Sequence, residues 1–307
     1  MPRHFLSLAD LTPDELRDLL DLSGRIKADP AAWRDACRGQ SLAMVFQKPS
    51  LRTRVSFEVG IFELGGQGIY LGPRDIQLHR GESVADTARV LSRMVHGIMA
   101  RVFGHDDLLQ LAASSSVPVI NGLSDLLHPV QVLADLLTMT EHFGALDGRK
   151  LAYVGDGNNM THSLLYGGAL MGMRVSVAHP DGYGPDAAVV ARALQLAERT
   201  GATLEIGQDP VAAVRGADAV YTDTWASMGQ EDERELRIAH FDGYQVDARL
   251  MREAADGAIF MHCLPAHRGE EVSDEVIEGP QSVVFDEAEN RLHVQKAIMV
   301  RLMGRVV

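Results

Sequence analysis

The chain has 307 residues, of which 46% are hydrophobic, so it can bury a sizeable core, and two domains are more expected than one. Aspartate and glutamate number 42 against 29 lysines and arginines, and the net charge of −13 argues against nonspecific binding to nucleic acid or to a membrane. The longest uncharged stretch, residues 108–124, contains serine, proline, glycine and asparagine and cannot span a bilayer, and no signal-peptide run opens the sequence. Two cysteines without zinc-like spacing or a disulfide framework fit a cytoplasmic protein.

The first half of the chain alternates short apolar runs with helical patterns. Its first helix is predicted to begin at Thr12, because this capping residue is followed by Pro13 and, three residues after the cap, by Glu15. Short strands separated by helices indicate a parallel sheet covered on both faces. The predicted strands are 42–46, 68–71, 98–102 and 117–120, and the predicted helices lie near 53–64, 82–95 and 105–114.

Residues 48–58 form the most informative motif, because they place serine, threonine and two arginines where a strand gives way to a helix. The first amides of a helix lack intrahelical partners and the helix dipole is positive there, so Ser50, Arg52 and Thr53 are expected to cradle a phosphate. Arginine suits a bidentate hold on phosphate or carboxylate, and the motif lacks the glycines of a Walker loop. The alternative is an N-cap flanked by solvated arginines, although one serine or threonine would suffice for that.

A third arginine lies at a strand end in this half. Arg101 closes the predicted strand 98–102, and its guanidinium could reach the same anion as Arg52. The alternative is a surface arginine that pairs with Asp106 or Asp107. The sequence alone does not decide between these two roles.

A histidine and a glutamine follow the fourth predicted strand. His128 and Gln131 stand at the start of a long predicted helix over 128–143, three residues apart and therefore on one helix face. A histidine donor and a glutamine amide can polarise and orient a carbonyl or an amide. We therefore expect both side chains to point toward a ligand.

A second alternating series follows a break at residues 144–148. The expected fold class is α/β, with two doubly wound parallel-sheet domains linked by long helices and an active site in the cleft between them. We expect a first domain over 1–142, onto which a C-terminal helix at 290–307 packs back, and a second domain over 143–289. The predicted strands of the second half are 151–154, 174–178, 203–206, 219–222 and 259–262, with a strand-like run at 282–285 and a last helix over about 290–303.

Polar side chains also follow strands of the second half, where ligands bind in such sheets. Residues 155–159 look like a dinucleotide loop but lack its third glycine, so Asn159 is expected to bind a carboxylate or an amine instead. Asp223 suits an ammonium group, and Ser227 with the amide of Met228 suits a carboxylate. The alternative is a turn in which the aspartate and the serine act as caps.

A cysteine stands beside a histidine after the strand at 259–262. Cys263 and His262 are compatible with a nucleophilic thiol or with a buried, apolar cysteine. His262 and His267 lie close in sequence, but the leucine and proline between them indicate a loop rather than a metal site. We therefore expect no metal ion and no cofactor.

In their order, these motifs resemble those of the transcarbamylase family over essentially the whole chain. The family's phosphate motif reads Ser-x-Arg-Thr-Arg, and here it is followed by the strand-end arginine and by His-Pro-x-Gln. The Asp-x-x-x-Ser-Met-Gly loop at 223–229 and the His-Cys-Leu-Pro run at 262–265 are similar to those of members that use ornithine, whereas aspartate-using members carry His-Pro-Leu-Pro. Leu51 departs from the family, which often has threonine there.

The resemblance implies an ornithine carbamoyltransferase, in which carbamoyl phosphate and L-ornithine give L-citrulline and phosphate in arginine biosynthesis, or the reverse in arginine catabolism. It also implies direct attack by the neutral δ-amine, and a homotrimer or an assembly of trimers in which Gln77 acts in the neighbouring subunit's site. The residues implied for carbamoyl phosphate are Ser50, Leu51, Arg52, Thr53, Gln77, Arg101, His128, Gln131, Cys263, Leu264 and Arg291, of which Arg52, Arg101, His128 and Cys263 are catalytic. The residues implied for ornithine are Asn159, Asp223, Ser227 and Met228.

Two other functions stay open at this point. One is a transcarbamylase for a different amine, such as putrescine or an N-acylated ornithine, against which the Ser-Met-Gly loop argues. The other is a noncatalytic binding protein or decoy paralogue. Such a protein is expected to lose Arg52 or His128, and this chain keeps both.

Overall fold

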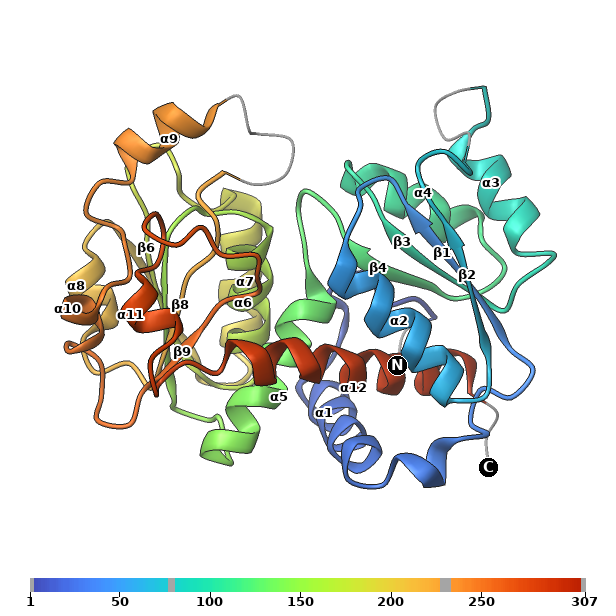
Figure 1. The fold of residues 1–307 in the computed structure, drawn as a ribbon, viewed down its shortest axis with the longest axis horizontal. Helices are drawn as coiled ribbons and strands as arrows, with labels where there is room; N and C mark the ends of the chain where they lie inside the picture. Colours follow the sequence, from blue (N-terminus) through green and yellow to red (C-terminus); the bar gives the residue numbers. More distant parts are fainter. Residues whose placement is uncertain (1–2, 77–80, 227–232, 305–307) are drawn as a thin grey trace. The chain divides into compact units, whose positions relative to one another are not determined.

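The structure, a computed structural model, describes residues 3–76, 81–226 and 233–304 and forms two compact units (Figure 1). The first unit comprises the chain as far as Leu137 together with the segment from Glu289 onward, and the second comprises Thr138–Ala288. Each unit contains one parallel sheet, so the predicted α/β class with two parallel-sheet domains is confirmed. Within the described ranges, no helix is both long enough and apolar enough to cross a membrane.

The sheet of the first unit is parallel, with its strands in the order β2-β1-β3-β4. The strands are β1 (Ser41–Phe46), β2 (Gln67–Leu71), β3 (Gly97–Arg101) and β4 (Val119–Leu123). The helices that lie wholly in this unit are η1 (Leu8–Asp10), α1 (Pro13–Ala28), η2 (Pro30–Trp33), α2 (Leu51–Glu63), α3 (Val84–Leu91) and α4 (His105–Ser114). Two further helices, α5 (Pro129–Phe143) and α12 (Val284–Met303), lie partly in it. The two middle strands are buried along almost their whole length, which explains why each reads as an apolar run.

Helices cover both faces of this sheet. On one face, Val45, Ile98 and Ala100 form a buried cluster with residues of α3 and α4. On the other face α2 packs against β1 and β2. A Cβ at Gly60 of α2 would lie 3.1 Å from the Met299 Cε of α12, so the glycine lets these two helices approach closely.

Local sequence signals placed the first helix correctly. The Thr12 Oγ1 accepts the N–H of Glu15 at 3.2 Å, and the Glu15 Oε2 accepts the N–H of Thr12 at 2.9 Å. This reciprocal pair satisfies two helix-terminal donors, as a capping box does. The predicted start of this helix is confirmed.

The fourth strand is shifted from its prediction at 117–120. β4 begins at Val119 and continues through an asparagine and a glycine, a pair that is typical of turns. Here the Asn121 Nδ2 donates to the Leu6 carbonyl at 2.9 Å, and a Cβ at Gly122 would lie 2.5 Å from the Met99 Sδ. Tertiary contacts therefore extend the strand past a turn-like dipeptide.

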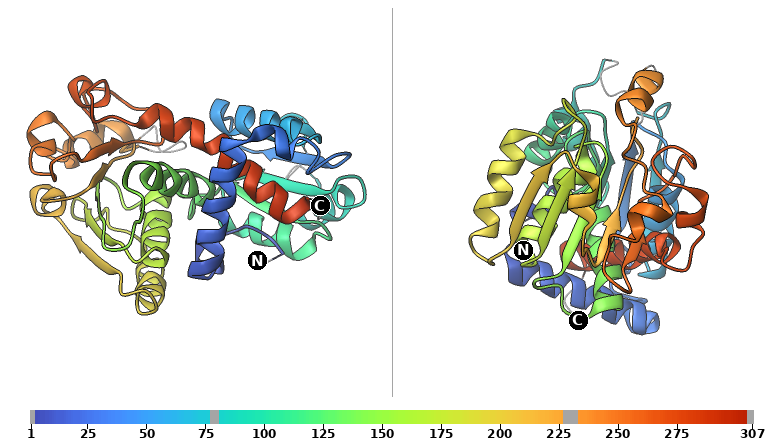
Figure 2. Two further views of the ribbon diagram at one scale, coloured as in Figure 1. Left: turned by 90° about the horizontal axis from the view of Figure 1, so that it is seen from below. Right: turned by 90° about the vertical axis from the view of Figure 1, so that its left-hand side faces the viewer.

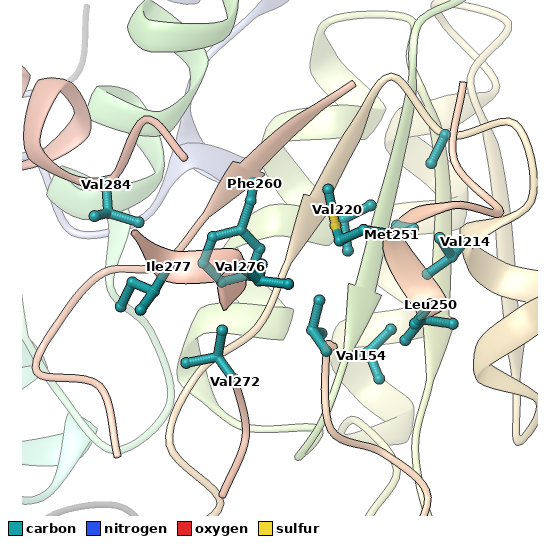
Figure 3. Packing of buried hydrophobic residues seen from close by; sticks show 13 residues of the cluster. Val154, Val214, Val220, Leu250, Met251, Phe260, Val272, Val276, Ile277 and Val284 are labelled. Carbon is teal, nitrogen blue, oxygen red and sulfur yellow. The ribbon is translucent and has the colours of Figure 1, made fainter. Parts of the chain in front are cut away.

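The sheet of the second unit is parallel, with its strands in the order β7-β6-β5-β8-β9. The strands are β5 (Lys150–Val154), β6 (Arg174–Ala178), β7 (Thr203–Gly207), β8 (Ala219–Tyr221) and β9 (Ile259–Met261). The helices are α6 (Asn159–Leu170), α7 (Ala187–Ala197), α8 (Pro210–Val214), α9 (Arg234–His240), α10 (Ala248–Met251) and α11 (Asp274–Ile277). Val154, Val220 and Phe260 form a buried cluster with α8, α10 and α11 on one face (Figure 3), and α6 and α7 cover the opposite face (Figure 2).

The prediction for the end of the second half was wrong in two respects. The strand-like run at 282–285 is not a strand, and the last helix begins at Val284 rather than near residue 290. Only Ser282 forms an isolated bridge, to Phe260, and the Glu287 N–H already donates to the Val283 carbonyl at 2.9 Å. The two adjacent valines suggested a strand, but their backbone passes directly into α12.

Candidate active site

The loop after β1 ends at Ser50, which caps α2. Ser50 has an extended backbone (φ −160°, ψ 120°), and its Oγ accepts the N–H of Thr53 at 3.3 Å. The cap places Leu51 and Arg52 in the first helical turn, where backbone N–H groups and the helix dipole favour an anion. The Leu51 side chain is 76% exposed and carries no hydroxyl. This residue can therefore donate only its backbone amide to an anion at the helix terminus.

Arg291 of α12 links this helix start to α5. It is almost fully buried, its Nη2 donates to the Thr53 Oγ1 at 2.7 Å, and its Nη1 donates to the Gln131 Oε1 at 3.0 Å. The Gln131 Nε2 donates in turn to the Asp135 Oδ1 at 2.9 Å, which settles the orientation of the amide. The guanidinium therefore holds the threonine and the glutamine in a fixed relation, a positioning role that the sequence did not indicate.

Arg101 and His128 belong to the same charged environment. Arg101 ends β3 and is 6% exposed, so the alternative of a surface arginine is wrong. Burial, and then the guanidinium groups of Arg291, Arg101 and Arg52, hold the pKa of His128 well below its usual range. His128 is therefore neutral near pH 7, so one ring nitrogen carries a proton and the other is an acceptor.

Within the first unit, the structure thus brings together most residues that the sequence singled out. Hydrogen bonds connect Ser50, Thr53, Gln131 and Arg291, while electrostatic interactions connect three arginines to the histidine. Gln77 lies outside the described residues. The result is a cationic half-site at a helix N-terminus, suited to a small phosphorylated anion.

The second unit has its own polar centre around Asp223. The Asp223 Oδ2 accepts from the Asn158 Nδ2 at 2.9 Å, and its Oδ1 accepts from the Thr224 N–H at 2.8 Å and from the Cys263 Sγ at 3.1 Å. These residues follow β5, β8 and β9, which are neighbours in the sheet. The carboxyl ends of three parallel strands therefore meet at one buried carboxylate.

The loop after β5 owes its shape to Gly157 and Asn158. A Cβ at Gly157 would lie 2.2 Å from the Pro185 N, so the glycine makes room for the protein's own backbone rather than for a pyrophosphate. Asn158 caps α6 through its Oδ1, which accepts the N–H groups of Met160 and Thr161. Asn159, the residue favoured from the sequence, is the first residue of the helix.

The loop after β9 is held by His262. Its Nδ1 accepts the Leu264 N–H at 2.8 Å, so its Nε2 carries the proton and donates to the Glu271 Oε1 at 3.2 Å. Its backbone N–H donates to the Glu287 Oε2 at 3.0 Å. Leu264 has a left-handed backbone (φ 57°), an unusual conformation for a leucine, and the imidazole stabilises it.

Two groups of side chains bring potential metal ligands within 4.8 Å of one another among the described residues. The groups are Asp223, His262 and Cys263, and His267, Glu270 and Glu271. In the first group, His262 has no ring nitrogen left for an ion, because one accepts the Leu264 N–H and the other faces Glu271. In the second group, Glu270 already pairs with Arg234. Neither group is a preformed metal centre.

Comparison with known families gives this geometry its context. The family profile "Aspartate/ornithine carbamoyltransferase, carbamoyl-P binding domain" matches residues 3–141, and the profile "Aspartate/ornithine carbamoyltransferase, Asp/Orn binding domain" matches residues 147–302. The chain belongs to the aspartate/ornithine carbamoyltransferase family. Within this family, the cationic half-site lies in the part that matches the carbamoyl-P binding domain, apart from Arg291.

Members of the aspartate/ornithine carbamoyltransferase family that are similar to this chain include several ornithine carbamoyltransferases. The chain is 61% identical to an ornithine carbamoyltransferase of Symbiobacterium thermophilum, over 98% of both chains. It is 55% identical to an ornithine carbamoyltransferase of Thermococcus kodakarensis, over 99% of this chain and 97% of the other. Its structure matches that of the ornithine carbamoyltransferase from Pyrococcus furiosus with a TM-score of 0.96 and 51% identity, over 99% of this chain and 98% of the other.

Sequence reasoning missed several residues of this carbamoyltransferase fold. Asn158 donates to the Asp223 carboxylate, Arg237 pairs with Asp156, and Glu271 accepts from His262. Asn158 is adjacent to Asn159, the residue expected to bind ornithine, and its position as a helix cap was the signal that could have identified it. Arg237 lies on a short helix far along the chain and gave no signal. Ser227 and Met228 lie outside the described residues.

Proposed function

We propose that the protein transfers the carbamoyl group of carbamoyl phosphate to the side-chain amine of L-ornithine, which gives L-citrulline and phosphate. The observation that carries this activity is the 61% identity to an ornithine carbamoyltransferase over 98% of both chains. The two half-sites fit the two substrates, since one is cationic and the other is built around a carboxylate. The reaction belongs to arginine metabolism.

The cationic half-site is proposed to bind carbamoyl phosphate. Arg52, Arg101 and the amide of Leu51 would hold the phosphate, whose negative charge grows as it leaves. The neutral imidazole of His128 would donate its N–H to the carbonyl oxygen, on which charge develops during attack. Gln131, held by the Arg291 guanidinium, would orient the carbamoyl amide.

The second half-site is proposed to bind ornithine. Asp223 would pair with the α-ammonium, Asn159 would assist it, and Ser227 with the amide of Met228 would hold the α-carboxylate. The neutral δ-amine would then attack the carbamoyl carbon directly. The new C–N bond forms, the C–O bond to phosphate breaks, and the amine loses a proton. The Cys263 thiol and the Leu264 carbonyl would contact the reacting groups, without a covalent enzyme intermediate.

We also propose that the active form is a homotrimer or an assembly of trimers, located in the cytoplasm. An exposed apolar row on α2 supports self-association, because its members lie four, four and three residues apart and share one helix face. These residues are Leu51, Val55, Val59 and Phe62. Gln77 would reach the site of the neighbouring subunit.

An acceptor panel tests the proposal against its rivals. Purified protein with carbamoyl phosphate is offered L-ornithine, putrescine and an N-acylated ornithine in parallel, and the carbamoylated product is measured. We expect citrulline formation to dominate, because a site that pairs a polar substrate group rejects analogues without it by up to about 10⁴-fold. A preference for either of the other amines would refute the assignment, and no product from any of them would favour a noncatalytic role.

A further inference from the structure

Resting on the proposed function, we infer that Arg237 is a positioning residue for ornithine: it ties the loop that carries Asp223 to the loop that carries Asn158, and thereby sets the affinity for the acceptor. Arg237 lies on α9 and is 7% exposed. Its side chain is not bonded to Asp223 in the described structure, so it is proposed to act through other residues rather than on the substrate.

The guanidinium of Arg237 joins two loops that follow different strands. Its Nη1 donates to the Asp156 Oδ2 at 2.9 Å and to the Trp225 carbonyl at 2.9 Å. Asp156 follows β5, two residues before Asn158, and Trp225 follows β8, two residues after Asp223. The Arg237 guanidinium thus fixes the separation of the two loops whose side chains meet at the Asp223 carboxylate.

Aromatic packing fixes the arginine itself. Its guanidinium lies over the ring of Tyr183 with 5.1 Å between the guanidinium carbon and the ring centroid. Tyr183 contacts Phe241 with 4.9 Å between centroids, and Phe241 stacks on Trp225 at 5.3 Å. The Nε donates to the Glu233 Oε2 at 3.0 Å, within the same helical segment. Arg237 is therefore held from several directions before any ligand binds.

The Asp156 carboxylate depends on its contact with the Arg237 guanidinium. Asp156 is 9% exposed, and burial raises its pKa to about 6, although the Arg237 guanidinium opposes that shift. Without the guanidinium, a buried carboxylate would lose its principal counter-charge, and the β8 loop would lose a donor to the Trp225 carbonyl. Both losses would loosen the loops around Asp223, while residues of the first unit keep their contacts.

Steady-state kinetics of Arg237→Gln and Arg237→Lys test the inference, with Arg234→Gln as the matched control. Arg234 lies on the same helix and is about half exposed, and it pairs with Glu270 rather than with either loop. We expect Arg237→Gln to raise the KM for ornithine by at least about tenfold, since hydrogen bonds from a charged group are lost. The KM for carbamoyl phosphate should stay within about twofold, because the residues proposed to hold its phosphate, Arg52, Arg101 and Leu51, lie in the first unit.

The lysine variant separates positioning from general destabilisation. Arg237→Lys keeps the charge but loses the planar fork, so its ornithine KM should fall between those of the parental enzyme and the glutamine variant. If Arg237→Gln does not fold, the ornithine KM of Arg237→Lys alone tests the positioning role. L-Norvaline, which lacks the reacting amine, should show the same order of affinities by calorimetry in the presence of carbamoyl phosphate.

Three results would overturn the inference. An unchanged ornithine KM in both variants would do so, as would parallel weakening of both substrates, or an equal effect of Arg234→Gln. A parental enzyme that does not carbamoylate ornithine would refute the proposed function, and this inference with it. Normal parental turnover with unaffected variants would refute the inference alone.

Discussion

Replacement of Asp223 by asparagine tests the acceptor half-site most directly, because the carboxylate accepts hydrogen bonds on both oxygens. The donors are the side chain of Asn158 on one oxygen, and the Thr224 N–H with the Cys263 thiol on the other. An asparagine that keeps its oxygen toward the second pair must point its NH₂ at the Asn158 NH₂. Asn158 cannot flip to relieve this, because its Oδ1 caps α6.

The expected loss follows from that geometry. One buried donor facing another donor costs about 1–3 kcal/mol. This cost is present in the free enzyme as well, so it should appear mainly as a lower free energy of unfolding. Removal of the Asp223 charge opposite the substrate ammonium costs transition-state binding about 1.5–3 kcal/mol, the usual value of a hydrogen bond to a charged group. We therefore expect kcat/KM for ornithine to fall by about 10- to 10²-fold, since each 1.4 kcal/mol is a factor of ten.

Steady-state kinetics with ornithine and with putrescine form the assay, together with chemical unfolding of each variant. Asp209→Asn is the control, because Asp209 caps α8 with its side chain and asparagine caps equally well. Putrescine has no carboxylate and is expected to be a poor substrate whose rate changes little. If soluble Asp223→Asn keeps parental kcat/KM for ornithine, or slows both amines equally, the proposed pairing with the α-ammonium is wrong.

Four other outcomes are expected. Arg52→Ala should lower kcat/KM by near 10²-fold, about 3 kcal/mol, since a donor to the leaving phosphate is lost, and near-parental kinetics would contradict the phosphate assignment. Incubation with labelled carbamoyl phosphate alone should leave Cys263 unmodified by mass spectrometry, and a stoichiometric adduct would refute direct attack. Mixing inactive Gln77 and Arg52 variants should restore some activity through hybrid sites, and failure after verified subunit exchange would place each site within one chain. The pKa of Asp156 is raised from 3.8 to about 6, so its protonated form favours folding below pH 3.8 and this contribution is lost as the pH rises through about 6. Asp156→Asn should therefore flatten the unfolding free energy against pH across this window, and an unchanged slope would contradict the shift.

The features predicted well from sequence are those with short-range causes. The Thr12 cap and the buried strand β1 each depend on residues within a few positions of one another. The two-domain α/β class followed from the same local signals, because strands and helices alternate along the whole chain. The site residues at strand ends could be proposed because ligands of parallel sheets bind there.

The features that sequence reasoning missed depend on distant partners. Arg237 meets Asp156 across 81 positions, and Arg291 meets Thr53 across 238 positions. No periodicity or spacing carries information about such pairs. The predicted strand at 282–285 was wrong for a related reason. β-Branched residues favour strands, but here the Val283 N–H donates only to the Phe260 carbonyl, and the chain then enters α12.

The left-handed backbone of Leu264 has a consequence for which residues this position can tolerate. A leucine there is disfavoured by about 1–2 kcal/mol, a penalty that glycine does not meet. However, the Leu264 side chain also packs against the buried cluster of the second sheet, and glycine would lose that anchor. A β-branched residue would keep apolar surface but resist the backbone conformation even more strongly. In a saturation library, we therefore expect this position to admit very few residues, although the proposed chemistry uses only its carbonyl.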